Sequence, residues 1–177
     1  MTITLAIDTS TSRTSVGIIC DGELIWSGFR DGATAHGLAL PELVQEAITG
    51  RQVDELVVGM GPGPFTGLRI GIAFAHSFAL ARDIPVRGVC SLDAIAAQVN
   101  EKDFIITVDA RRKEVYWARY RDGVRVGQPA VNSPSDVKAA LIYSELSPDL
   151  LALAQLPGDI TEPIYLRHPD AIATADR

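Results

Sequence analysis

Apolar residues near the start of the chain form short runs separated by turn residues. Residues 3–8, 15–20 and 23–30 are such runs, and Asp21-Gly22 separates the last two. An Asp-Gly pair between apolar runs favours a tight hairpin turn. The opening of the chain therefore predicts a meander of three strands.

The next segment changes to a helical period. Its apolar positions recur three and four residues apart and form one stripe, which consists of Leu40, Leu43, Val44, Ala47 and Ile48. Proline fits best in the first turn of a helix, so Pro41 places the predicted start near residues 38–40. Gly50 is expected to end this helix.

Strands and helices then alternate up to about residue 100. Residues 55–60 and 85–90 are apolar runs of the kind found in buried strands. Residues 66–81 between them predict a helix, and a further helix is expected at 91–99 with Ser91 as its N-cap. This alternation predicts an α/β fold.

A second unit is expected to start near Asp103. Residues 104–109 and 115–120 predict two strands, and residues 135–146 predict a helix. Residues 150–156 are an apolar run that fits either a helix or a strand. Residues 163–167 predict a short strand or a segment docked on the rest of the chain.

The two halves begin in the same way. Each starts with a β-run that ends in aspartate, Asp8 or Asp109, followed by a polar turn and a hairpin partner. This similarity indicates a duplication. We therefore predict two subdomains, residues 1–101 and a shortened second one over residues 102–177.

Composition narrows the classes of function. The chain has 177 residues, with 16 Lys and Arg against 22 Asp and Glu, and a formal net charge of −6. Phosphate binding needs clustered cations, so the net negative charge argues against this chain binding tRNA or DNA by itself. Cys20 and Cys90 lie in apolar runs, which excludes a disulfide framework or a zinc ribbon. The absence of a basic leader and of a membrane-length apolar stretch predicts a cytoplasmic protein without a membrane association.

Several catalytic motifs are missing from the sequence. It has no Walker phosphate loop, no G-x-S-x-G elbow and no H-E-x-x-H. Its histidines, His36, His76 and His168, lie far apart in the chain. We therefore expect no bound metal and no nucleophile–base pair that would sustain peptidase activity.

The string Gly61-Pro62-Gly63-Pro64-Phe65-Thr66-Gly67-Leu68-Arg69 is the most distinctive in the chain. It joins a predicted buried strand to a helix N-terminus, where anions often bind. Its prolines have no N–H to donate, which favours a rigid packing turn. An anion site and a packing turn both remain open, and Thr66 is a reasonable N-cap.

Small residues recur at every fourth position of the helix that follows: Gly67, Gly71, Ala75 and Ala79. Residues four apart share a helix face, so this stripe allows another backbone to approach closely. Glycine inside a helix costs about 1 kcal/mol relative to alanine, which indicates a packing reason. The approaching backbone could belong to a partner or to the chain itself.

Two loops occupy positions where actin-like, sugar-kinase-like folds hold ATP phosphates. The first, Asp8 to Ser12, lacks the glycine that lets the backbone approach a phosphate. The second, Asp109-Ala110-Arg111-Arg112, also lacks glycine but contains two cations that could hold an anion or simply be solvated. The architecture fits an ATPase fold with degraded phosphate loops. Candidate nucleotide or anion contacts are Asp8, Ser10, Thr11 and Arg111.

The sequence resembles the TsaB family, also called YeaZ, which takes part in the biosynthesis of threonylcarbamoyladenosine in tRNA. The resemblance rests on strings that follow one another along nearly the whole chain: Leu5 to Ser10, His36 with the helix behind it, Gly61 to Gly71, Val108 to Tyr116, and Tyr165-Leu166-Arg167. The string that ends in FTGLR is the most specific of them.

The resemblance implies an actin-like ATPase fold of the sugar-kinase and Hsp70 type, without catalytic residues or a cofactor of its own. It also implies a heterodimer with the catalytic subunit TsaD, which uses ATP and Mg²⁺ together with the ATPase TsaE, and tRNA contact only through that complex. The first two helices form the family's shared interface, which also predicts a homodimer when the chain is alone. Carried onto this chain, the interface residues are His36, Leu40, Leu43, Val44, Ala47, Gly67, Gly71, Ile72, Ala75 and Ala79.

The sequence departs from the family pattern in two places. Pro64 stands where serine is usual, and residues 134–163 are compressed. The implied role is that of a non-catalytic partner in modifying adenosine 37 of tRNAs that read codons beginning with A. The alternative is an active actin-like ATPase or phosphotransferase that holds Mg²⁺ with Asp8 or Asp109.

Overall fold

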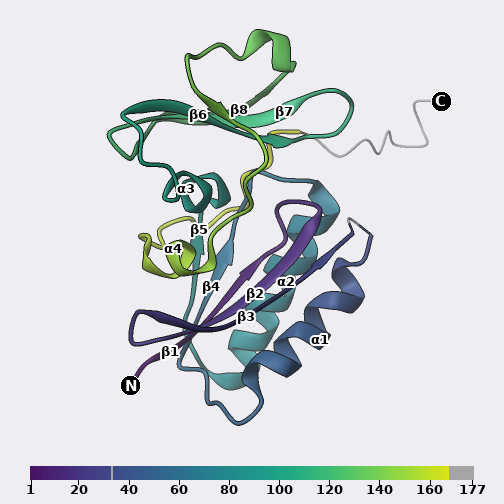
Figure 1. Cartoon of the computed structure of the whole chain (residues 1–177). Coiled ribbons are helices and arrows are strands. Elements are labelled where there is room, and N and C mark those ends of the chain that lie inside the picture. The colour runs from purple at the N-terminus through teal and green to yellow at the C-terminus, as the bar shows by residue number, and fades with distance from the viewer. Residues whose placement is uncertain (33, 168–177) are drawn as a thin grey trace, which may run out of the picture.

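The computed structural model describes residues 1–32 and 34–167, and within these residues the strands form two sheets (Figure 1). The first has the order β3-β2-β1-β4-β5, with β1 (Ile3–Asp8), β2 (Arg13–Cys20), β3 (Glu23–Asp31), β4 (Glu55–Gly59) and β5 (Val86–Val89). The second has the order β8-β7-β6-β9, with β6 (Asp103–Asp109), β7 (Val115–Arg121), β8 (Val124–Asn132) and β9 (Ile142–Tyr143).

The two sheets repeat one plan. In the first, β1 pairs antiparallel with β2 and parallel with β4, and β2 continues antiparallel to β3. In the second, β6 pairs antiparallel with β7 and parallel with β9, and β7 continues antiparallel to β8. Asp8 and Asp109 end the corresponding strands β1 and β6. The similar openings of the two halves thus reflect a repeated meander with an added parallel strand.

Helices cover both faces of the first sheet (Figure 1). Helices α1 (His36–Ile48) and α2 (Phe65–Arg82) lie side by side on one face. Helices α3 (Ser91–Ala96) and α4 (Leu150–Gln155) pack together on the other side, where α4 contacts β1 and β2 and α3 contacts β6 and β7. Although α4 comes after the strands of the second sheet, it covers the first.

The core under α1 and α2 consists of side chains from the central strands and the predicted helical stripe. Leu5 and Ile7 of β1 pack in one cluster with Leu40 and Leu43 of α1, and all four are fully buried. A separate cluster joins α3 to the second sheet, in which the rings of Phe104 and Tyr120 stack 5.4 Å apart. Among the described residues, no helix is long and apolar enough to cross a membrane.

The predicted helix at 135–146 is wrong. The chain forms a single 3₁₀ turn, η1 (Pro134–Asp136), and then pairs β9 with β6, helped by a 3.0 Å hydrogen bond from the N–H of Ile105 to the carbonyl of Leu141. An open sheet edge satisfies the backbone here, which local helix propensity does not anticipate. Residues 163–167 are a docked segment and not a strand, since the N–H of Ile164 donates to the carbonyl of Met60.

Candidate functional site

Asp8, which ends β1, lies in the interior of the molecule. Its Oδ1 accepts hydrogen bonds from the backbone N–H and the hydroxyl of Ser10, at 2.8 and 2.7 Å. Its Oδ2 accepts a 2.6 Å hydrogen bond from the hydroxyl of Ser91. Burial raises the pKa of the Asp8 carboxyl, and the hydrogen bonds from Ser91 and Ser10 oppose that shift. Both carboxyl oxygens are therefore engaged within the protein.

The same carboxyl ties together three parts of the chain. A Cβ at Gly59, the last residue of β4, would collide with Oδ2 of Asp8, so the side chain lies directly on that backbone. The Ser91 hydroxyl also accepts a 3.2 Å hydrogen bond from the N–H of Gly61. The predicted N-cap role of Ser91 is wrong, because Cys90 is the N-cap and the hydroxyl serves Asp8 instead.

His36 is the first residue of α1, and its side chain is buried. Its Nδ1 lies 2.8 Å from the hydroxyl of Thr14, which is also buried. Burial lowers the pKa of His36, and the nearby Asp8 opposes that shift. The imidazole is therefore neutral and serves as a hydrogen-bonding core residue.

The stripe of small residues on α2 faces the chain's own first loop. A Cβ at Gly71 would collide with the hydroxyl of Thr9, and one at Gly67 would lie 2.7 Å from the Thr9 carbonyl. The Thr9 hydroxyl donates a 2.8 Å hydrogen bond to the carbonyl of Gly67. The backbone that approaches this stripe therefore belongs to the chain itself.

Most of the predicted interface lies on the inner sides of the two helices. Nine of its ten residues are buried within the chain: His36, Leu40, Leu43, Val44, Ala47, Gly67, Gly71, Ala75 and Ala79. Ile72 alone among the ten is partly exposed. A periodic stripe marks the side of a helix that is buried, but not which surface buries it.

The outer side of α1 and α2 carries exposed apolar side chains. Leu38 is 79 % exposed on α1, and Leu80 is 85 % exposed on α2. On α2 the rings of Phe74 and Phe78 stack 6.0 Å apart and are half-buried. The exposed side of these two helices, which includes Leu38 and Leu80, is called the outer face here, and it is the part of the predicted interface helices that a partner can reach.

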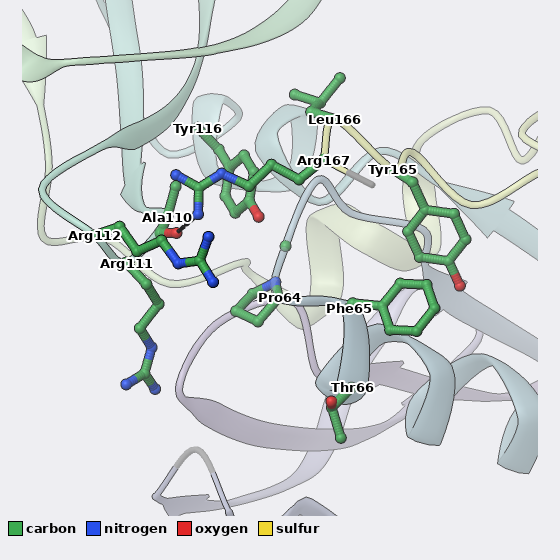
Figure 2. A pocket seen from close by; sticks show the side chains of 11 residues that line it. Pro64, Phe65, Thr66, Ala110, Arg111, Arg112, Tyr116, Tyr165, Leu166 and Arg167 are labelled. Atoms are coloured by element: carbon green, nitrogen blue, oxygen red, sulfur yellow. Dashed lines mark hydrogen bonds between the residues drawn. The ribbon is translucent and has the colours of Figure 1, made fainter. Parts of the chain in front are cut away.

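A pocket of about 390 Å³ lies where the N-terminus of α2, the β6–β7 turn and residues 165–167 meet (Figure 2). Arg111, Arg112 and Arg167 line it, together with Tyr116 of β7. The guanidinium of Arg167 donates a 2.8 Å hydrogen bond from Nη1 to the carbonyl of Ala110 and forms an ion pair with Glu114. On the opposite side, the rings of Phe65 and Tyr165 lie 5.0 Å apart.

A second pocket, of about 210 Å³, adjoins the first and shares Pro64 and Arg111 with it. Its lining includes Thr11 and Asp109. Of the four predicted nucleotide contacts, Thr11 and Arg111 therefore reach a pocket, whereas Asp8 and Ser10 are buried.

Some pocket residues had no role in the sequence prediction, although their motifs were recognised. Tyr116 belongs to the Glu-Val-Tyr string, and Tyr165 and Arg167 belong to the Tyr-Leu-Arg string. Only the fold brings both strings to α2. Within residues 1–32 and 34–167, no cluster of three His, Cys, Asp or Glu side chains could hold a metal ion.

The repeated sheets with helices on their faces place the chain in the actin-like class of α/β proteins. Residues 32–165 match a family model described as "TsaD: tRNA N6-adenosine threonylcarbamoyltransferase". Together with its named relatives, this match shows that the chain belongs to the TsaB (YeaZ) family.

Curated relatives share up to nearly half of the aligned residues. An uncharacterized protein of Mycobacterium leprae is 46 % identical over 93 % of this chain and 48 % of its own length. An uncharacterized protein of Mycobacterium tuberculosis is 41 % identical over 94 % of this chain and 92 % of its own. The tRNA threonylcarbamoyladenosine biosynthesis protein TsaB of Escherichia coli is 36 % identical over 66 % of this chain and 54 % of its own. The chain thus spans about half the length of the first and third of these relatives.

Solved structures from Pseudomonas aeruginosa share the fold. One, described as having similarity to the peptidase YeaZ, superposes with a TM-score of 0.78 at 25 % identity and covers 94 % of this chain and all of its own. The other, described as YeaZ, has a TM-score of 0.74 at 26 % identity, covering 88 % of this chain and 90 % of its own.

Proposed function

We propose that this chain is a non-catalytic partner subunit in the threonylcarbamoyl modification of adenosine 37, in tRNAs that read codons beginning with A. In this proposal it forms a heterodimer with a TsaD-type catalytic subunit in the cytoplasm and activates it, with help from a TsaE-type ATPase. The catalytic subunit uses ATP and Mg²⁺, and this chain holds no cofactor. The role in the pathway rests on family membership, and the non-catalytic character rests on Asp8.

The environment of Asp8 supports the absence of phosphoryl chemistry. A carboxylate that holds Mg²⁺ must present an oxygen to the ion. Asp8 instead accepts hydrogen bonds from Ser10 and Ser91 on its two oxygens and is only 1 % exposed. This arrangement disfavours the alternative of an ATPase or phosphotransferase that uses Asp8.

The Thr14–His36 pair has the hydroxyl and imidazole that a hydrolase would need. Both residues are buried beneath α1, with 0 and 2 % of their surfaces exposed. A nucleophile must reach its substrate. This buried pair therefore favours a structural role in the core over peptidase activity.

The outer face of α1 and α2 supports the partner role. Isolated exposed leucines are common on proteins, but α1 and α2 together expose Leu38 and Leu80, and α2 also leaves a stacked pair of phenylalanines only half-buried. A larger subunit of the same fold could cover this face with its own helix pair. A second copy of the chain could do the same, so we also propose a homodimer when the partner is absent.

Reconstitution with a TsaD-type subunit and a TsaE-type ATPase tests this proposal. The catalytic subunit should modify tRNA efficiently only when this chain is present. Leu80→Glu should abolish co-elution and activation, because it places a charge at the most exposed apolar position of α2 on the outer face. Val124→Glu is the matched control, since Val124 is 69 % exposed at the start of β8 in the second sheet.

Two results would overturn the proposal. One is threonylcarbamoyl transfer by this chain alone. The other is ATP hydrolysis by the purified chain that disappears in Asp8→Asn. Sedimentation over a concentration series should show a dimer of the wild type and a monomer of Leu80→Glu, and a wild-type chain that stays monomeric at all concentrations would exclude the homodimer.

A further inference from the structure

The pocket at the α2 N-terminus is strongly biased in charge. Eleven residues line it, and they include Arg111, Arg112 and Arg167 but no aspartate or glutamate. The chain as a whole has six more acidic than basic residues. Glu114, which lies outside the lining, pairs with Arg167 and offsets one of these charges, and the lining itself still favours anions on an otherwise acidic protein.

The turn that supplies two of these arginines has an unusual backbone. Arg111, Arg112 and Lys113 have φ values of 63, 56 and 62°, three consecutive left-handed conformations that each cost about 1 kcal/mol for a side-chain-bearing residue. The turn is closed by a 2.9 Å hydrogen bond from the N–H of Ala110 to the carbonyl of Glu114. The cations are thus presented by a defined turn.

The other groups around the pocket that could bind an anion are also held in place. Arg167 is fixed by its hydrogen bond to Ala110 and its ion pair with Glu114. Helix α2 begins at Phe65 with no capping side chain, so the N–H groups of its first turn point toward the pocket end of the helix.

The opposite wall is aromatic. Tyr165 is 38 % exposed and packs against Phe65 (Figure 2). The guanidinium carbon of Arg69 lies 4.0 Å from the centre of the Phe65 ring. Phosphate-binding cations beside an exposed ring match the chemistry of a nucleotide, in which an anion and a flat base are joined. A peptide carboxylate or inorganic phosphate would leave the ring unused.

We propose that this pocket binds one nucleotide of the RNA substrate, with its phosphate toward Arg111, Arg112 and the α2 N-terminus and its base against Tyr165. The inference deepens the proposed function and rests on it, because the pathway supplies an RNA. The net charge of −6 then has a specific consequence: RNA is repelled from most of the surface and contacts this chain at one place.

The test measures binding of a fluorescent RNA hairpin with a tRNA anticodon-arm sequence to the full chain and to its complex with the TsaD-type subunit. Arg111→Gln/Arg112→Gln should lower affinity about tenfold at about 0.1 M salt and reduce the salt dependence by about two counterions. Arg30→Gln/Arg121→Gln is the matched control, since it removes the same charge from two exposed positions elsewhere and should change little.

Variants of Tyr165 test the contribution of base stacking separately from that of charge. Tyr165→Leu should weaken RNA binding several-fold without altering the salt dependence, whereas Tyr165→Phe should retain it. Equal losses in the two double variants would overturn the proposal, because binding would then follow net charge alone. AMP binding that is sensitive to Arg112, without RNA binding, would also overturn it in favour of a free nucleotide.

The outcome can be distinguished from that of the proposed function. Co-elution with the TsaD-type subunit decides whether the chain is its partner. The RNA affinity of that assembled complex decides whether the pocket binds RNA. If the complex forms normally and binds RNA equally well with and without Arg111 and Arg112, the proposed RNA site is wrong and the partner role still stands.

Discussion

The hydroxyl of Ser91 donates a 2.6 Å hydrogen bond to Oδ2 of Asp8, although 83 residues separate the two in the chain. This contact joins the end of β1 to the first turn of α3. The strand-ending aspartate of an actin-like fold is here part of the internal hydrogen-bond network. The contribution of the Asp8 carboxyl to the free energy of unfolding should therefore be measurable on the isolated chain.

Asp8→Asn should change how stability depends on pH. Because burial raises the pKa of Asp8 in the folded chain, the unfolded carboxyl ionises first as pH rises above about 3.8. The wild type then loses stability as pH rises from that value through the folded pKa. The asparagine side chain of the variant cannot ionise, so any stability deficit of the variant at pH 4 should shrink by pH 7. Urea unfolding at both pH values measures this, and a deficit that grows toward pH 7 would contradict it.

Ser91→Ala should destabilise the chain by about 1–3 kcal/mol, because it leaves a buried carboxyl oxygen without its donor. Ser135→Ala is a suitable control, since Ser135 is exposed and its hydroxyl bonds only to nearby side chains. Urea midpoints compare the two. Equal midpoints would show that the Asp8–Ser91 contact contributes nothing to stability.

His36 should make the fold sensitive to mild acid. Burial lowers its pKa, so below pH 6.5 the unfolded chain binds a proton that the folded chain does not. Stability should fall as pH decreases from 6.5, by at most about 1.4 kcal/mol for each pH unit. His36→Asn should remove this slope, whereas His76→Asn, at an exposed position on α2, should retain it. Thermal unfolding between pH 5 and 7 measures both.

Gly71→Ala should destabilise the monomer, because its Cβ would collide with the Thr9 hydroxyl. Overpacking of this kind costs about 1–3 kcal/mol. Gly37→Ala on α1 should instead stabilise by about 0.5–1 kcal/mol, since a Cβ there meets nothing within 4 Å. Urea unfolding gives both values. A folded, fully stable Gly71→Ala chain would mean that the small-residue stripe does not pack on Thr9.

Asp93 should be important for the second sheet. It accepts a 2.7 Å hydrogen bond from the buried Tyr120 hydroxyl and a bidentate pair from Arg125, which connect α3 to β7 and β8. Asp93→Ala should cost about 2–3 kcal/mol by leaving these donors unpaired. Asp103→Ala removes a comparable arginine pair from an exposed site and should have little effect. Hydrogen exchange of β7 amides would show whether the loss is local.

Local patterns predicted much of the fold because strands, turns and helices depend on neighbouring residues. Asp21-Gly22 forms the expected turn, with positive φ at both residues. The predicted helix at 135–146 failed because the open edge of β6 offered its backbone a partner far away in the chain.

The candidate site was less predictable for the same reason. Arg111 was identified from its motif, but Tyr165 joins it only because residues 163–167 dock beside Met60 and Phe65. Asp8 was placed at a phosphate loop because its strand ends there, and the sequence contains no local sign that Ser91 would donate a hydrogen bond to it inside the protein.

The sequence by itself determined the alternating α/β pattern, the duplicated openings and membership of the TsaB family, since each depends on order along the chain. Only the tertiary structure decided which surface the Gly67–Gly71 stripe meets, what the Asp8 carboxyl binds, and which cations share a pocket. These are contacts between residues distant in sequence, and helix periodicity records that a face is buried without recording its neighbour.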